Sequence, residues 1–383
     1  MTRVNLSFYV HIPYCVKRCG YCDFNTYTPA ELQISDGLSQ ISNSYIDLVI
    51  QEIEQARLAV GEAIVPTIFF GGGTPSLMEA SDIARVITRI KKSFKLSDDC
   101  EITLETNPDT VDKQKLAAFK DAGINRISIG MQSAVDHVLK TLDRTHNPDN
   151  LPQVTQWASE VGFKDISVDL IYGTPGESLS DWQVSIDAAL ALPINHISAY
   201  ALIVEEGTKL ANAIKRGEIG NVDDDLTAEK YLMADQAFTK AGFTWYELSN
   251  WSRANGESKH NSAYWLNQNW WGVGPGAHSH IDGKRWWNVK HPNLYKTKIT
   301  NNESPVLDQE ILEPIQIESE RLMLSIRLPS GVSKESLSNE QLKILQPYVE
   351  SGALDLNNWS AGSVSLSLNG RLIADRIVRE ILL

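Results

Sequence analysis

Residues 11–24 of this chain read His-Ile-Pro-Tyr-Cys-Val-Lys-Arg-Cys-Gly-Tyr-Cys-Asp-Phe, and they contain Cys15, Cys19 and Cys22. The chain has 383 residues and only four cysteines, and the fourth, Cys100, stands alone. A disulfide scaffold spreads its cysteines along the chain, so three cysteines within eight residues indicate a metal ion or a metal cluster instead. We expect Cys100 to be an ordinary small core residue.

Two kinds of metal centre are compatible with the three cysteines. A zinc site would need a fourth ligand, which His11 could supply, although the paired C-x2-C knuckles of most zinc sites are missing. Three cysteines can also hold a [4Fe-4S] cluster, whose usual ligation uses four. The missing fourth ligand would leave one iron open to an exchangeable group, which makes such a cluster a reaction site.

The first 200 residues alternate between two hydrophobic periods. Apolar residues at 83, 86, 87, 90 and 94 follow one face of a helix, and those at 46, 49, 50 and 53 do the same. Short strand-like runs lie between such helices, at residues 8–12, 67–70, 101–105, 126–129, 166–171 and 196–202. Six strand–helix repeats predict a parallel sheet with right-handed crossovers, and an open or partial (βα)6 barrel of the α/β class. Functional residues are then expected at the carboxyl ends of the strands.

The pattern changes after about residue 206. A helix is expected over 227–241, and residues 244–300 are aromatic and read as irregular. This stretch holds seven of the ten tryptophans and four of the eight histidines, and its charge is 7 − 3 = +4. Helices near 318–326 and 370–382 complete a small C-terminal α+β domain. We divide the chain into 1–206, a connecting region at 207–310, and 311–383.

The overall charge is 35 − 48 = −13, which does not suit a general nucleic-acid binder. The N-terminal residues hold no apolar run typical of a signal peptide, and the most apolar later stretch, 194–204, is too short to span a bilayer. We therefore expect a soluble cytoplasmic protein with no transmembrane segment, for which peripheral contact with a membrane remains open.

Polar and glycine residues follow several of the predicted strands. The run Gly71-Gly72-Gly73-Thr74-Pro75 would form a tight turn where backbone can approach a ligand closely. Glu105 ends the third predicted strand. Asp169 lies inside a strand covered on both faces, where an unpaired carboxylate is costly and needs a partner or a polar ligand.

The Cys15-x3-Cys19-x2-Cys22 loop resembles the cluster loop of the radical S-adenosylmethionine (SAM) superfamily, and 71–75 resembles that superfamily's Gly-Gly-Gly-Thr-Pro motif. The spacings from Tyr9 to Asp169 and into the tail are similar to those of the oxygen-independent coproporphyrinogen III oxidases and their haem-chaperone relatives. The resemblance implies a radical-SAM partial barrel, a [4Fe-4S] cluster held by the three cysteines, and SAM bound at the open iron. It places the SAM site at Tyr9, Phe24, Gly72, Gly73, Thr74, Glu105, Gln132, Arg144 and Asp169.

Two features favour the haem-chaperone branch of that family. The oxidases resemble this chain but carry a further cysteine two residues after the third, where this chain has Phe24. The chaperone branch has Phe there and a His-Asn-x-x-Tyr-Trp motif, which this chain matches at 260–265. His260 is then a candidate haem ligand, for which a buried, hydrogen-bonded structural role is the competing interpretation.

The sequence therefore predicts a haem chaperone that passes haem to haem-requiring respiratory proteins, with an electron donor for the cluster as a further partner. The alternative is an oxygen-independent coproporphyrinogen III oxidase, which would convert two propionates to vinyl groups by radical hydrogen abstraction. A third interpretation is a zinc-stabilised structural protein. Whether SAM is cleaved stays open, and no residue is assigned a catalytic role.

Overall fold

The computed structural model describes residues 4–33 and 38–382, with the side chains of 38–43 excepted. One large sheet organises the chain, and its centre consists of six parallel strands that follow one another in sequence order. These strands are β2 (Ser7–Ile12), β3 (Ala63–Gly72), β4 (Lys95–Thr106), β5 (Arg126–Gln132), β6 (Asp165–Tyr172) and β7 (His196–Ala201). The strand order runs from β13 to β8, and these end strands do not pair with each other in the described chain. The predicted partial (βα)6 barrel is confirmed.

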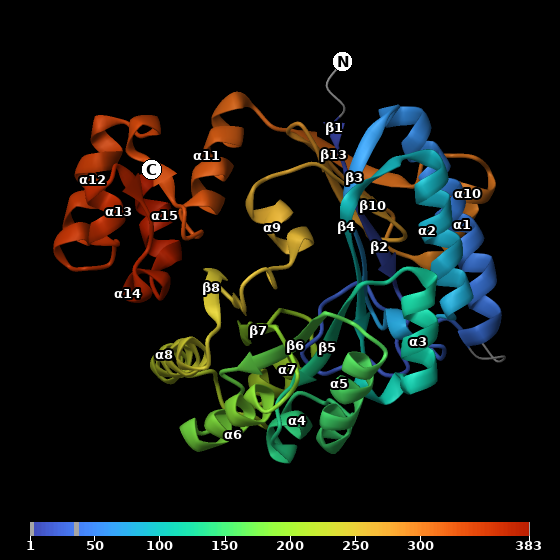
Figure 1. Cartoon of the computed structure of the whole chain (residues 1–383), viewed down its shortest axis with the longest axis horizontal. Helices are drawn as coiled ribbons and strands as arrows, with labels where there is room; N and C mark the ends of the chain where they lie inside the picture. The colour runs from blue at the N-terminus through green and yellow to red at the C-terminus, as the bar shows by residue number, and fades with distance from the viewer. Residues whose placement is uncertain (1–3, 34–37, 383) are drawn as a thin grey trace.

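Helices follow the parallel strands: the first six connect one strand to the next, and the last two follow β7. They are α1 (Leu38–Val60), α2 (Ala80–Ser93), α3 (Lys113–Ala122), α4 (Asp136–Thr141), α5 (Leu151–Glu160), α6 (Leu179–Leu190), α7 (Lys209–Lys215) and α8 (Asp224–Lys240). Figure 1 shows α1, α2 and α3 side by side along one side of the sheet. Their apolar stripes, such as Ile83, Val86 and Ile90 of α2, join Phe8 and Phe70 of the strands in one buried core, as the helical period predicts.

The expectation that residues 244–300 are irregular is wrong. They form short strands that extend the sheet at both edges, and two helices. The elements are β8 (Thr244–Glu247), β9 (Asn250–Ser252), α9 (Lys259–Trp265), β10 (Trp270–Val273), β11 (His278–Ile281), β12 (Lys284–Asn288) and α10 (Pro292–Thr300), followed by β13 (Val306–Ile311). Strands of three to five residues show too few alternations for a period to be recognised. β10 pairs in parallel with β2, so this region lies beside the first barrel strand.

Helix α9 lies on the side of the sheet opposite α1, α2 and α3 (Figure 1). It packs against β3, where the His260 ring stacks on Phe69 with 5.0 Å between centroids. Its N-terminus is capped by the buried Glu101 carboxylate at the amino end of the barrel, which accepts hydrogen bonds from the backbone N–H groups of Lys259 and His260 at 3.0 and 2.9 Å. The chain thus places a helix against the inner face of the barrel.

The C-terminal residues form a smaller α+β unit with a core of its own. It contains α11 (Pro314–Ser325), α12 (Asn339–Glu350), α13 (Leu356–Ser360), α14 (Leu368–Arg371), α15 (Ala374–Leu382) and the two-stranded sheet of β14 (Val332–Ser333) and β15 (Ser363–Val364). Buried apolar residues such as Ile326, Leu345 and Ile377 form this second core. Over the described ranges, the helices include none with the length and apolar content needed to cross a membrane.

Candidate active site at the carboxyl end of the barrel

The cysteine loop follows β2 and is held by two helix ends. The N–H of Gly20 donates to the carbonyl of Leu142 at the end of α4, and the carbonyl of Gly20 accepts from the N–H of Leu210 in α7, at 3.0 and 2.9 Å. Tyr21 packs on the small apolar cluster that includes Leu142 and Leu210. A side chain at position 20 would come within 3.0 Å of Asp143 Cβ, so the close approach favours glycine there. These contacts fix the loop on the barrel rim.

All three thiols of the loop are free. Thr74 Oγ1 donates to Cys15 Sγ at 3.7 Å, and Arg144 Nη1 donates to Cys19 Sγ at 3.5 Å. Burial raises the pKa of Cys15, and it raises the pKa of Cys22 to about 11, with the neighbouring loop thiols adding to both shifts. The three sulfurs therefore lie close enough to repel one another as thiolates, and a positively charged iron centre would favour the ionised form.

His11 is not a free metal ligand. Its Nε2 donates to the carbonyl of Asn25 at 2.9 Å, so its Nδ1 accepts from the Tyr9 hydroxyl at 3.0 Å. Burial lowers the pKa of His11 to about 4, so the ring is neutral. Over the part of the chain that the structure describes, no three Cys, His, Asp or Glu side chains form a group that could hold a metal ion. A Cys3His zinc site with His11 as the fourth ligand does not match this geometry.

The Gly71–Pro75 segment turns directly over the cysteine loop. The N–H of Gly73 donates to the carbonyl of Ile12 at 2.7 Å, and the N–H of Thr74 donates to the carbonyl of Tyr14 at 2.8 Å. A Cβ on Gly73 would lie 2.6 Å from the Tyr14 carbonyl oxygen, and Gly72 has φ +110°. Glycine fits position 73 because it has no Cβ to clash, and it fits position 72 because it readily adopts a positive φ. The segment therefore brings backbone without side chains beside the cysteines.

Two buried carboxylates lie close to each other, and one of them contacts this segment. Glu105 accepts from the N–H of Gly72 at 3.0 Å, and Asp169 accepts from the Ser128 hydroxyl at 3.0 Å. Burial raises the pKa of Glu105 to about 8, with the charge of Asp169 adding to the shift, and burial also raises the pKa of Asp169. Tyr9 lies close enough to Glu105 for that carboxylate to raise its pKa further, beyond the effect of burial. A cationic ligand would favour both carboxylates in their ionised form.

Arg144 connects the cysteine loop to the end of β5. Besides Cys19 it contacts the carbonyl of Gly130 at 3.2 Å and His146 Nδ1 at 3.0 Å. Gln132 is buried at the end of β5 with φ +62°, a strained conformation for a residue with a side chain. A Cβ on Gly130 would lie within 2.9 Å of both the Gln132 and the Arg144 side chains, so these two groups converge on one point.

The structure thus brings together most of the residues expected at the SAM site, whereas Phe24 lies apart from them and His260, the candidate haem ligand, is enclosed. Phe24 is 63% exposed beyond the cysteines, and no contact of its side chain with the others is seen in the described chain. His260 is 2% exposed, and both ring nitrogens are engaged: Nδ1 donates to Thr67 Oγ1 at 2.7 Å and Nε2 accepts from the Tyr264 hydroxyl at 2.9 Å. His260 therefore has the arrangement of a buried, hydrogen-bonded histidine rather than that of an open haem ligand.

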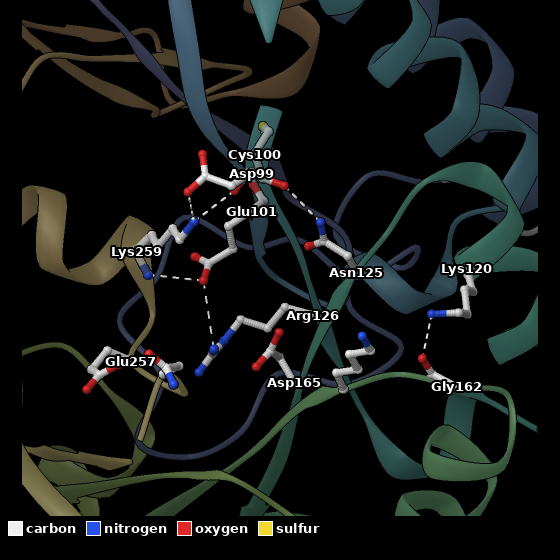
Figure 2. A pocket seen from close by; sticks show the side chains of 12 residues that line it. Asp99, Cys100, Glu101, Lys120, Asn125, Arg126, Gly162, Asp165, Glu257 and Lys259 are labelled. Atoms are coloured by element: carbon white, nitrogen blue, oxygen red, sulfur yellow. Dashed lines mark hydrogen bonds and ion pairs between the residues drawn. The ribbon is translucent and has the colours of Figure 1, made fainter. Parts of the chain in front are cut away.

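A cavity of about 200 Å³ opens at the other end of the barrel, near the amino ends of β4, β5 and β6 (Figure 2). Four of the eight charged side chains that line it form two pairs with each other. Lys259 contacts Asp99, and Arg126 lies 3.7 Å from Glu101 while donating to the carbonyl of Gly256. These contacts hold the N-terminus of α9, so we assign these polar side chains of the cavity a structural role.

Several residues of the site were not expected from the sequence. Ser128 lies beside Asp169, Asn25 fastens the end of the cysteine loop to the carbonyls of Pro275 and Lys290, and His146 contacts Arg144. Of these residues, only Ser128 lies within a predicted strand, where its position relates to that of a predicted site residue. It lies opposite Glu105 in the β4–β5 register and so belongs to the same inner face of the barrel.

The donor set fits an iron–sulfur cluster with a charged organic ligand. The carboxyl ends of the parallel strands bring together three free thiols of one loop and two carboxylates. A hydroxyl and a guanidinium donate to the thiols, and the glycine backbone lies beside them. A cluster is larger than a single ion, so it accepts thiolates that lie farther apart. Hydrogen bonds to cluster sulfurs are among the contacts by which proteins adjust the reduction potential of such clusters.

Comparison with known proteins agrees with this geometry. The model of the radical SAM superfamily matches residues 9–189. The heme chaperone HemW of Mycobacterium tuberculosis (strain H37Rv) is 41% identical over 374 residues, which cover 98% of this chain and 94% of that protein. The heme chaperone HemW of Bacillus subtilis is 34% identical over 97% of each chain.

A solved structure shows the same fold. Coproporphyrinogen III oxidase (HemN) from Escherichia coli, described as a radical SAM enzyme, superposes with a TM-score of 0.83 over 99% of this chain and 90% of its own, at 20% identity. The sequence relatives identify the family, and the solved structure shows the shared fold. The chain belongs to the heme chaperone HemW family of the radical SAM superfamily.

Proposed function

We propose that this protein binds haem and delivers it to haem-requiring respiratory proteins, and that it carries a [4Fe-4S] cluster and SAM. The identity to heme chaperones over nearly the whole chain is the observation that carries the proposal. The residue two positions after Cys22 supports it, because Phe24 stands where the resembling oxidases have a further cysteine. Residues 1–206 would hold the cluster and SAM, 207–310 would handle haem, and 311–383 would form the C-terminal domain.

In this proposal Cys15, Cys19 and Cys22 hold the cluster. SAM would bind along the bare backbone of Gly72 and Gly73, facing Glu105 and Asp169, with Thr74, Gln132 and Arg144 beside the cluster sulfurs and Tyr9 below. When bound, the cluster and SAM would supply one-electron chemistry, which requires an electron donor. The free thiols suit the cytoplasm, where cysteines stay reduced, and we place the activity there.

A haem-transfer assay tests the proposal. Anaerobically reconstituted protein loaded with haem should restore haem absorbance and activity to haem-depleted respiratory membranes faster than the same amount of free haem does. Protein without haem is the control for carried-over activity. A chain that binds no haem, or that transfers it no faster than free haem, would contradict the proposed carrier function.

The second candidate function is oxygen-independent coproporphyrinogen III oxidation, which the shared fold with HemN favours. Reconstituted protein, SAM, reductant and coproporphyrinogen III are expected to yield no protoporphyrinogen IX. Substantial turnover of coproporphyrinogen III under these conditions would move the assignment to the oxidase.

Glu105 provides a prediction about SAM binding. With a pKa of about 8 the carboxyl is mainly protonated at pH 7, and a cationic ligand stabilises the carboxylate and lowers this pKa. SAM binding at pH 7 should therefore release up to about one proton per chain, and the release should disappear well above pH 8, where Glu105 is already ionised. Calorimetry in buffers of different ionisation enthalpy measures this release.

The Glu105→Gln variant keeps an acceptor for the Gly72 N–H but cannot lose a proton. It is expected to lose the release and to bind SAM roughly tenfold more weakly, which corresponds to about 1.4 kcal/mol. Glu229→Gln, on the exposed side of α8, is the matched control and should behave like the parent. Equal proton release by the Glu105→Gln variant and the parent would show that Glu105 does not face the ligand.

A further inference from the structure

The eight histidines of the chain all lie in the described part, and their ring contacts differ. Six have a hydrogen bond to at least one ring nitrogen and a seventh forms an ion pair: His11, His146, His196, His260, His280 and His291 have hydrogen bonds, and His137 lies 3.3 Å from Asp181. Within the described structure, His278 is the one whose ring nitrogens have no hydrogen bond or ion pair, and it is exposed. An exposed imidazole with both nitrogens free is available to bind iron.

The strand register places His278 on the inner face of the barrel. Trp270 of β10 lies opposite both Ser7 of β2 and His280 of β11, and residues directly opposite each other point to the same face. Since side chains alternate along a strand, His278 shares a face with Tyr9 and His11. After the larger effect of burial, a proton on His278 would further lower the pKa of His11, as expected for neighbouring rings. His278 therefore lies beside the site described above.

Trp287 holds the imidazole in one orientation. It lies opposite His278 in the β11–β12 register, and the two rings stack with 5.7 Å between centroids and 24° between planes. Stacking covers one face of the imidazole and leaves the ring edge, which carries both nitrogens, uncovered. Such an arrangement presents a nitrogen lone pair without allowing the ring to turn freely.

The charges around His278 suit an anionic ligand that carries iron. Partial burial, Lys290 and Arg285 all lower its pKa, which favours the neutral ring that can donate a lone pair. Arg285 is already paired with Glu310 and Glu320 at 2.8 and 2.6 Å. Lys290 is exposed, and no ion pair of its side chain is seen in the described residues, so its ammonium is open to a carboxylate. The two propionates of haem are carboxylates of this kind.

We propose that His278 is an axial ligand of the haem iron, oriented by Trp287, with Lys290 contacting a haem propionate. The inference rests on the proposed haem-carrier function, and it assigns the iron to His278 rather than to the enclosed His260. Haem bound here would lie on β11 and β12, which extend the sheet beyond β10, on the face that also carries the candidate SAM site.

Resonance Raman and EPR spectra of ferric haem bound to the reconstituted protein test the assignment. His278→Ala should lose the histidine-ligated signature and bind haem at least about tenfold more weakly, and added imidazole should restore the signature. Restoration by imidazole separates ligation from a merely structural role. Lys290→Ala should weaken binding by about two- to fivefold without changing the iron signature, as expected for an exposed ion pair.

His291→Ala is the matched control, because His291 is also exposed and lies on the neighbouring segment, where it contacts Tyr27. It should keep the parent's spectrum and affinity. If His278→Ala binds haem with the parent's spectrum and affinity, the assignment is wrong while the carrier function stands. If the parent itself binds no haem, both the assignment and the carrier function are overturned.

Discussion

Replacing any one of Cys15, Cys19 and Cys22 by alanine is expected to reduce cluster iron and sulfide to less than about a tenth of the parent's content. The loop offers three thiols, so each variant would leave two ligands for the proposed cluster, in which one iron is open. The loop itself should stay in place, because backbone hydrogen bonds of Gly20 and the apolar packing of the Tyr21 ring remain in each variant. Iron and sulfide analysis after anaerobic reconstitution measures the effect.

Cys100→Ala is the matched control. Cys100 is buried in β4, and its thiol approaches only the carbonyl of Glu101, at 3.8 Å, among the contacts of the described chain. This variant should keep its full cluster. Stoichiometric zinc without sulfide in the parent protein, lost in the three loop variants, would instead support the zinc-stabilised structural protein.

Long elements and local motifs were the predictable part of this molecule. The helix over 80–93 and the six barrel strands carry clear periods, and helical connections between parallel strands leave few topologies open. The cysteine loop and the Gly71–Pro75 segment could be placed at the carboxyl end of the barrel, because each directly follows a strand. Cys100 was expected in the core and is buried there.

Contacts between distant segments were not predictable from local patterns. Arg144 lies after a short helix, with no hydrophobic period to show that it turns toward Cys19, 125 residues earlier. His260 looked like a ligand because it sits among aromatic residues, but Thr67 and Tyr264 occupy both of its nitrogens. The position of His278 depends on a parallel pairing of β10 with β2 that joins segments more than 250 residues apart.

A buried ion pair on the barrel rim offers a second strong test, this time of stability. Lys230 of α8 donates to the carboxylate of Glu177 at 2.8 Å and to its backbone carbonyl at 2.7 Å. The two side chains are 1% and 0% exposed. Glu177 also accepts from the N–H of Gly173 at the end of β6. The pair therefore ties α8 to the loop that follows β6, on the same end of the barrel as the cysteines.

Lys230→Met is expected to lower the free energy of unfolding by about 3–5 kcal/mol, measured by urea denaturation. The methionine fills similar volume, so the loss comes from leaving the Glu177 carboxylate buried without its cation. Lys240→Met, at the exposed end of the same helix, should change stability by less than about 0.5 kcal/mol. In the double variant Lys230→Met, Glu177→Gln the neutral amide removes the buried charge, so much of the stability should return. A Lys230→Met protein as stable as the parent would show that water reaches Glu177 and that α8 is not held to the rim through this pair.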